Sequence, residues 1–212
     1  MRAYVYVDGF NLYYGLLKKS PHKWLDLNAL CRMLLPEYYV LKIKYFTALV
    51  NYRESNPHAH ERQRIYLRAL RTLPNVEVIL GHFLTHPVNM VLESPLSPEE
   101  RIVRVLKSEE KGSDVNMASH LLLDGFRDRY DVAVVLSNDS DLGTPIAMVK
   151  DELNKKVGLL NPQKRPSMVL LELADFIRKV RSGVLEKCQF PQKIKDINGS
   201  VRKPKVWNDP TP

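Results

Sequence analysis

Short apolar runs alternate with amphipathic stretches along most of this chain. Residues 3–7 are β-branched and aromatic and predict a strand. The continuous apolar run 132–136 is typical of a strand buried on both faces, as in a parallel sheet. Further strands are expected near residues 41–50, 76–83, 102–106 and 156–160, and helices over about 10–19, 58–73, 114–127 and 145–153.

The order of these elements predicts the fold class. Strands that alternate with helices indicate right-handed βαβ units and a three-layer α/β/α sandwich with a mainly parallel central sheet. Three prolines within residues 84–98 predict a loop there. The 212 residues suit one domain, placed at residues 1–186, followed by a tail at 187–212.

Cysteine usage and hydropathy narrow the class of protein. Cys31 and Cys188 form no CxxC pair, which excludes a zinc ribbon and a disulfide-rich secreted scaffold and fits a reducing compartment. No apolar run approaches the ~20 residues of a membrane span. Asp8 also interrupts the apolar N-terminal stretch, which argues against a signal peptide. We therefore expect a cytoplasmic protein with no membrane partner.

The chain carries 32 Lys and Arg against 24 Asp and Glu, a net charge of +8. Such an excess attracts polyanions, so nucleic acid is the leading partner class, with a basic surface kept only for solubility as the alternative. Half of the excess lies in residues 187–212, where six basic residues face two acidic ones. Four prolines and the lack of an apolar period predict that this tail is an extended or partly disordered basic arm.

Polar residues gather where the predicted strands end, and in an open parallel sheet this edge binds ligands. Two carboxylates 4 Å apart repel by about 4 kcal/mol at an effective dielectric constant of 20. A divalent cation reverses that sign, and hard oxygen ligands suit Mg²⁺ or Mn²⁺. The candidates are Asp8 and Asn11 after the first strand, Asp114 at the start of helix 114–127, and Ser137, Asp139 and Asp141 after strand 132–136.

Several of these residues also have a local explanation. Asp8 could belong to a turn, Asn11 could be a helix N-cap, and Asp114 could cap its own helix. Thr144-Pro145 is a good helix start, so Asp139 and Asp141 are predicted to have no capping role and to serve a ligand.

Two further polar residues lie deeper in helix 114–127. Asp124 follows Asp114 by ten residues, about 15 Å along a helix, so the two cannot share one ion. We expect Asp124 to be a solvent-exposed or structural acid and His120 to be an ordinary surface histidine.

Three segments together resemble the NYN domain, the LabA/limkain-type branch of the PIN-like nuclease superfamily: Tyr6–Tyr13, Lys111–Asn116 and Ser137–Leu142. The resemblance implies an α/β sandwich, a Mg²⁺- or Mn²⁺-dependent ribonuclease and an acidic catalytic pocket. Many relatives carry an aspartate where this chain has His120, which leaves open whether the site binds one metal ion or two. The implied pocket consists of Asp8, Asn11, Asp114, Asp139 and Asp141.

Roles for these residues follow as hypotheses. Asp8, Asp114 and Asp139 would bind the metal directly, and Asp141 directly or through water. Asn11 would orient a water or a phosphate. Ser137 either bonds a phosphate oxygen or serves the turn.

Arg64, Arg68 and Arg71 form one stripe on helix 58–73, opposite an apolar stripe. The stripe is either a solvated face or a phosphate track that leads to the acidic pocket, assisted by Lys111 and the basic tail.

A metal-dependent ribonuclease that acts on RNA is the function these patterns favour. The main alternative is a PIN-like module that binds RNA or protein without turnover. An aspartyl-phosphate phosphatase would need an acid where the chain has Tyr6. The sequence leaves open whether the substrate is RNA or DNA, whether cleavage is internal or from an end, and whether the protein is a homo-oligomer.

Overall fold

Alternate residues of the first strand, β1 (Arg2–Asp8), belong to two different cores. Val5 and Val7 pack into one apolar cluster, whereas Tyr6 packs into the other. This alternation follows from the two-residue period of a strand, and it places β1 in the middle of a sheet covered on both faces. The computed structural model describes residues 1–52, 54, 56–94 and 101–208.

The described residues form a seven-stranded sheet in the order β4-β3-β2-β1-β5-β6-β7. Every neighbouring pair is parallel except β3 and β4. The further strands are β2 (Tyr39–Ala48), β3 (Val76–Val91), β4 (Ile102–Lys111), β5 (Val132–Leu136), β6 (Lys156–Asn161) and β7 (Phe176–Lys179).

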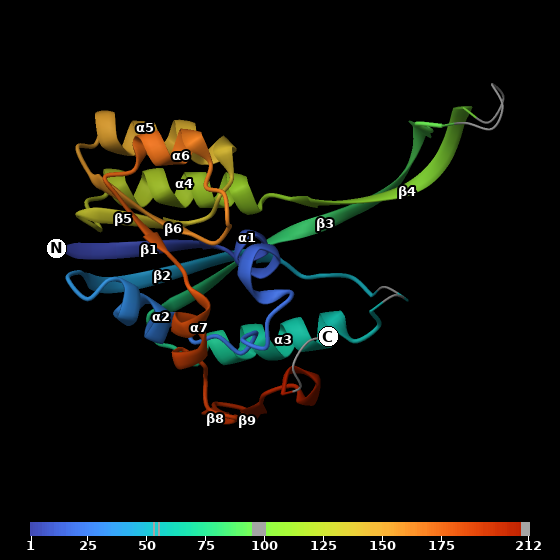
Figure 1. Cartoon of the computed structure of the whole chain (residues 1–212), viewed down its shortest axis with the longest axis horizontal. Helices are drawn as coiled ribbons and strands as arrows, with labels where there is room; N and C mark the ends of the chain where they lie inside the picture. Colours follow the sequence, from blue (N-terminus) through green and yellow to red (C-terminus); the bar gives the residue numbers. More distant parts are fainter. Residues whose placement is uncertain (53, 55, 95–100, 209–212) are drawn as a thin grey trace.

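Helices cover both faces of this sheet, which confirms the predicted α/β/α sandwich (Figure 1). One face carries α4 (Ser113–Phe126), α5 (Gly143–Asp151) and α6 (Met168–Leu173). The other carries α2 (Leu27–Leu34), α3 (Ala59–Leu70) and α7 (Ser182–Lys187). The helix expected over residues 10–19 is the short α1 (Gly9–Leu12) followed by a π-helical turn, η1 (Tyr13–Leu17).

The loop predicted for residues 84–98 is wrong over its first part. Residues 84–91 continue β3 and pair with β4, and Pro87 lies opposite Leu106. Beyond Gly81, no strand among the described residues pairs with β3 on its β2 side, so a residue without an N–H is tolerated there. Residues 95–100 of the predicted loop lie outside the described residues.

The predicted extended or disordered tail is also wrong over the part of it that is described, residues 187–208. A hairpin of β8 (Lys193–Asp196) and β9 (Gly199–Arg202) is followed by a 3₁₀ turn, η4 (Lys205–Trp207). The indole of Trp24 donates to the Pro191 carbonyl at 2.8 Å, and the Trp207 ring lies 6.2 Å from the Trp24 ring. The tail packs because its few apolar residues contact the rest of the domain, although their spacing follows neither a helical nor a strand period. The predicted boundary between residues 186 and 187 falls inside α7.

Candidate active site

The polar residues of the first and fifth strands meet where β1 and β5 lie side by side. Asp8 ends β1, and Ser137 directly follows β5. The Ser137 hydroxyl donates to Asp8 Oδ2 at 2.9 Å, so two segments 129 residues apart are in contact. From β1 the chain continues to β2 on one side, and β5 lies on the other. This is the switch point at which open α/β sheets bind ligands.

Asp8 is buried, with 5 % of its surface exposed. Its carboxylate accepts hydrogen bonds from the Asn11 backbone N–H at 2.9 Å and from the Asn11 amide at 2.6 Å. Asp8 is therefore the N-cap of α1, and Asn11 is not. Burial raises the pKa of Asp8, and the hydrogen bonds from Asn11 and Ser137 oppose that shift.

Two glycines bring the neighbouring elements close to Asp8 and Asp114. A Cβ on Gly9 would lie 2.8 Å from the carbonyl oxygen of Phe46, so only glycine lets α1 begin against β2. Gly112 has a φ of 96°, in the left-handed region that favours glycine. It turns the chain from β4 into α4 and places Asp114 in the first turn of that helix.

Asp114 is the point at which the acidic groups converge. Partial desolvation, together with the charges of Asp8, Asp139, Glu110 and Asp141, raises the pKa of Asp114 to about 6. Carboxylates from three separate segments thus act on one side chain. Glu110 was not among the residues predicted from the sequence to belong to the site. Its position near the end of β4, two residues before Gly112, was the signal, because residues there face the same edge of the sheet.

Asp139 has a local role that the sequence analysis did not expect. Its Oδ1 accepts the Asp141 backbone N–H at 3.1 Å and caps the 3₁₀ turn η3 (Ser140–Leu142). The following helix, α5, begins at Gly143 and not at Thr144-Pro145. The prediction that Asp139 has no capping role is wrong, because the chain adds a 3₁₀ turn before the helix. Asp141 is exposed.

A network of amides lines the site beside Asn11. Asn11 Oδ1 accepts from the backbone N–H of Asn138 at 3.3 Å and from Gln163 Nε2 at 3.2 Å. Asn138 Nδ2 in turn donates to Gln163 Oε1 at 3.1 Å. Sequence reasoning missed Gln163, although it follows the end of β6 by two residues and the strand-end rule applies to it.

The donor chemistry of this site fits a hard divalent cation. Its side chains offer carboxylate, amide and hydroxyl oxygens, and within the described residues no lysine or arginine forms an ion pair with Asp8, Asp114, Asp139 or Asp141. The predicted ligand set is not preassembled, however. In the described part of the chain, no three His, Cys, Asp or Glu side chains are grouped so that they could hold a metal ion. The caps explain part of this, because Asp8 and Asp139 each hold a nearby backbone N–H.

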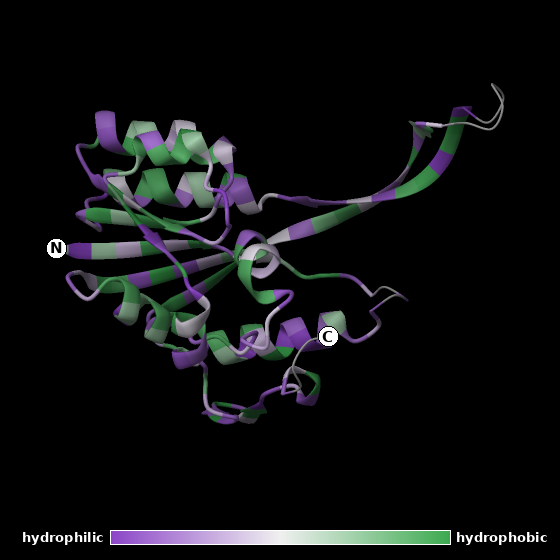
Figure 2. Cartoon of the chain, in the orientation of Figure 1, coloured by the Kyte–Doolittle hydropathy of each residue, from purple (hydrophilic) through white to green (hydrophobic). Residues whose placement is uncertain are grey.

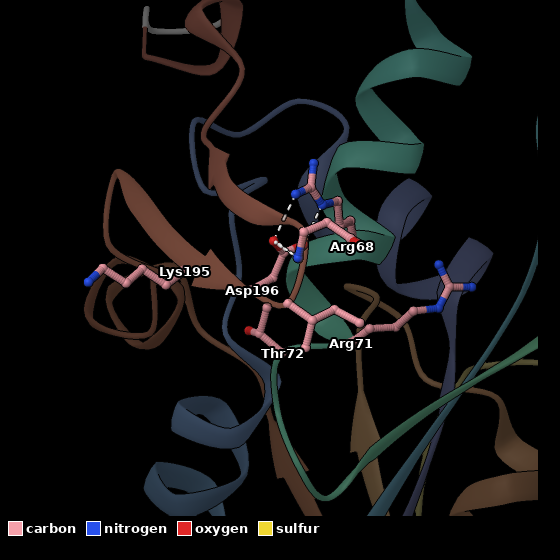
Figure 3. A pocket seen from close by; sticks show the side chains of 7 residues that line it. Arg68, Arg71, Thr72, Lys195 and Asp196 are labelled. Carbon is pink, nitrogen blue, oxygen red and sulfur yellow. Dashed lines mark hydrogen bonds and ion pairs between the residues drawn. The ribbon is translucent and has the colours of Figure 1, made fainter.

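The arginine stripe does not lead to this site. Helix α3 connects the end of β2 to the start of β3, so it runs away from the acidic edge toward the opposite edge of the sheet (Figure 1). Arg68 forms a two-pronged ion pair with Asp196 of the tail hairpin. With Arg71, Thr72 and Lys195, these two residues line a cavity of about 510 Å³ between α3 and the hairpin (Figure 3). The position of Arg68 and Arg71 thus favours the alternative of a surface role, and their contact with substrate stays a prediction.

Arg64 and Lys111 remain candidates by position. Arg64 is exposed near the middle of α3. Lys111 ends β4 directly before the turn into α4, and its amine lies 3.5 Å from Glu109. Their contact with substrate stays a prediction.

Behind the site, α4 carries a buried ionic network. Lys44 Nζ lies 2.5 Å from Asp124 Oδ2 and 2.9 Å from His120 Nδ1. Tyr6 and Arg129 also donate to Asp124, which is fully buried. Asp124 is thus the structural acid that was expected. His120 is not an ordinary surface histidine, because it bonds to a buried lysine from β2.

Comparison with known proteins agrees with this geometry. The parallel sheet, its two helical layers and the acidic switch point define a PIN-like α/β sandwich, a nuclease-type fold. The chain belongs to the NYN domain family, whose profile matches residues 2–180.

Two relatives illustrate the range of similar proteins. The chain is 31 % identical to the 6-hydroxy-3-succinoylpyridine 3-monooxygenase HspA of Pseudomonas putida, over 98 % of this chain and 75 % of that protein. A crystal structure of VPA0982 from Vibrio parahaemolyticus, a protein of unknown function, superposes with a TM-score of 0.57 at 18 % identity. That match covers 89 % of this chain and 96 % of the other and supports the fold. No described helix has the length and apolar character needed to cross a membrane.

Proposed function

We propose that this protein is a divalent-metal-dependent ribonuclease that hydrolyses RNA phosphodiester bonds at the acidic edge of its sheet. The observation that carries the proposal is the placement of Asp8, Asp114 and Asp139, from three separate segments, at the switch point of the sheet, where burial and the neighbouring carboxylates together raise the pKa of Asp114. Membership of the NYN family, a nuclease-type fold, supports it independently. Such a pool of like charge is unfavourable in a protein that binds nothing there.

Each residue has a proposed role. Asp8, Asp114 and Asp139 would hold Mg²⁺ or Mn²⁺, with Asp141 as a direct or water-mediated ligand. When bound, the cation would neutralise charge on the scissile phosphate and acidify a water molecule.

The remaining groups would position the substrate. Ser137 and Asn11 hold the buried Asp8 carboxylate in one orientation through their hydrogen bonds. Asn11 and Gln163 present amide groups that can orient a water or a phosphate oxygen. Lys111 would contribute a positive charge at the rim for the RNA backbone.

Cleavage of labelled single-stranded RNA by the purified chain tests this proposal, with Mn²⁺, with Mg²⁺ and with chelator. We expect metal-dependent cleavage that Asp139→Asn reduces by at least about 100-fold, or about 2.7 kcal/mol of transition-state stabilisation. Asp151→Asn is the matched control, because Asp151 is an exposed acid at the far end of α5. Equal cleavage by the wild type and Asp139→Asn would assign the activity to another site or a contaminant.

The similarity to HspA favours a second candidate, oxygenation of a hydroxylated pyridine. That reaction consumes O₂ and an electron donor, so oxygen uptake with 6-hydroxy-3-succinoylpyridine and a reduced nicotinamide or flavin distinguishes it from hydrolysis. Oxygen uptake without RNA cleavage would favour the oxygenase. Metal-dependent thermal stabilisation without either activity would favour a binding module.

A further inference from the structure

The distal half of the β3–β4 hairpin stands away from the body of the protein (Figure 1). β3 pairs with β2 only from Val76 to Gly81, yet it continues to Val91. From His82 to Val91 its partner is β4, in an unbroken antiparallel register that ends at Val91 opposite Ile102. We call residues 82–93 and 101–111 the arm.

Large apolar side chains are exposed on both faces of the arm. Paired residues across two strands share a face, and successive residues alternate between faces. Pro87 with Leu106 and Val91 with Ile102 therefore lie on one face. Val88 with Val105 and Met90 with Val103 lie on the other, and Figure 2 shows hydrophobic bands along both strands. The exposed fractions are 47 % for Leu84, 47 % for Met90, 64 % for Val91, 62 % for Ile102 and 76 % for Leu106.

An isolated ribbon of this kind needs a partner. A two-stranded sheet on its own is marginally stable in water, and its unpaired edges invite association. On the face that carries Val91, Ile102 and Leu106, the exposed apolar area is roughly 350 Å², which is the size of the largest patch on an ordinary monomer. A surface of this size and character is typical of a protein interface.

Charge argues against nucleic acid as that partner. The arm holds four basic and three acidic side chains, a net charge of only +1, in a chain whose total is +8. Within the arm, Lys107 and Glu109 pair at 2.7 Å, so part of this charge is already satisfied. A polyanion would be attracted to the rest of the molecule instead. The arm fits an apolar partner surface that carries little net charge.

We propose that the partner is the arm of a second copy of this chain, so that the protein is a homodimer held by two mutually packed arms. Two arms packed through the face of Pro87, Val91, Ile102 and Leu106 would bury roughly 1,000 Å² in total, polar side chains of that face included, which is about the lower limit for a specific interface. The two copies would use the same patch, as a closed two-fold pair requires. This inference does not depend on the proposed nuclease activity.

Sedimentation velocity of the full chain, with Leu106→Lys and Ile197→Lys variants, tests the proposal. Leu106 is largely exposed in the single chain, so lysine there leaves the monomer intact and charges only the interface. Ile197 is fully exposed at the β8–β9 turn and serves as the matched apolar-to-lysine control. We expect the wild type and Ile197→Lys to sediment as a species with a mass of twice 24.5 kDa, and Leu106→Lys as a species of 24.5 kDa. The dimer dissociation constant should rise at least ~100-fold in Leu106→Lys, with thermal unfolding of the body retained.

Three outcomes would overturn the proposal. They are a wild-type monomer at high micromolar concentration, a Leu106→Lys dimer as tight as the wild type, or a broad series of larger species in place of a closed pair. Association of a monomeric wild type with a different protein or with RNA through the arm would likewise exclude a second copy as its partner.

Discussion

The raised pKa of Asp114 makes the crowding of carboxylates measurable. Burial makes the largest contribution to this pKa, and the charges of four neighbouring carboxylates raise it further, so replacing one of those charges should lower it. The four carboxylates are those of Asp8, Asp139, Glu110 and Asp141. We expect Asp139→Asn to move the pKa of Asp114 toward its ordinary value of 3.8. Bound Mn²⁺ or Mg²⁺ should move it in the same direction and release protons, because the cation favours the ionised carboxyl.

The same shift has a consequence for stability. An acid whose pKa is higher in the folded state than in the unfolded state destabilises the fold when it is ionised. The unscreened cost of a shift from 3.8 to about 6 is about 3 kcal/mol. Because the Asp114 side chain is exposed, solvent screening reduces this cost to ~1 kcal/mol. The penalty is present above pH 6 and disappears as the pH falls toward 3.8.

Urea denaturation of the wild type, Asp114→Asn and Asp151→Asn provides the assay, with metal removed and the pH varied between about 4 and 7.5. We expect Asp114→Asn to raise the free energy of unfolding by ~1 kcal/mol at neutral pH, an advantage that shrinks on acidification. Asp151→Asn should stay within ~0.5 kcal/mol of the wild type throughout. Carboxyl NMR supplies the direct titration. A pKa of Asp114 near 3.8, or a neutral-pH stability lowered by Asp114→Asn, would refute the reasoning.

Two further predictions concern the network and the tail. Lys44→Met leaves the Asp124 carboxylate buried with one cation fewer, so it should lower the free energy of unfolding, measured in urea, by about 3 kcal/mol. Lys42→Met, which breaks the more exposed ion pair of Lys42 with Glu77, is the control and should lower it by less than ~0.5 kcal/mol. Trp207→Ala removes a ring that packs on Trp24 and should lower the free energy of unfolding by ~2 kcal/mol or more. An unchanged melting curve would mean that the packing of the tail does not stabilise the domain.

The parallel sheet and its strand ends could be predicted because their signals are local. The run 132–136 is apolar throughout and forms β5 over the same residues. The strand-end rule placed Asp8 and Ser137, which are 129 residues apart in the sequence, at the same edge of the sheet without any knowledge of contacts. These features depend on period and position, which the sequence displays directly.

Features that depend on tertiary partners could not be predicted in this way. His120 lies on a helix face that looks solvent-exposed until Lys44 arrives from β2. Pro87 argued against a strand because no pattern shows that β3 has lost its β2 neighbour by that point. The tail carries too few apolar residues for a period, yet Trp207 finds Trp24 across the fold.

Binding of Mn²⁺ in the absence of RNA tests the central claim most directly, by electron paramagnetic resonance of the free and bound ion. We expect saturable binding by the wild type and at least ~10-fold weaker binding by Asp8→Asn and Asp139→Asn, with binding by Asp151→Asn unchanged. Binding that is absent in the wild type, or equally strong in Asp8→Asn and Asp139→Asn, would contradict a cation site at the acidic edge of the sheet.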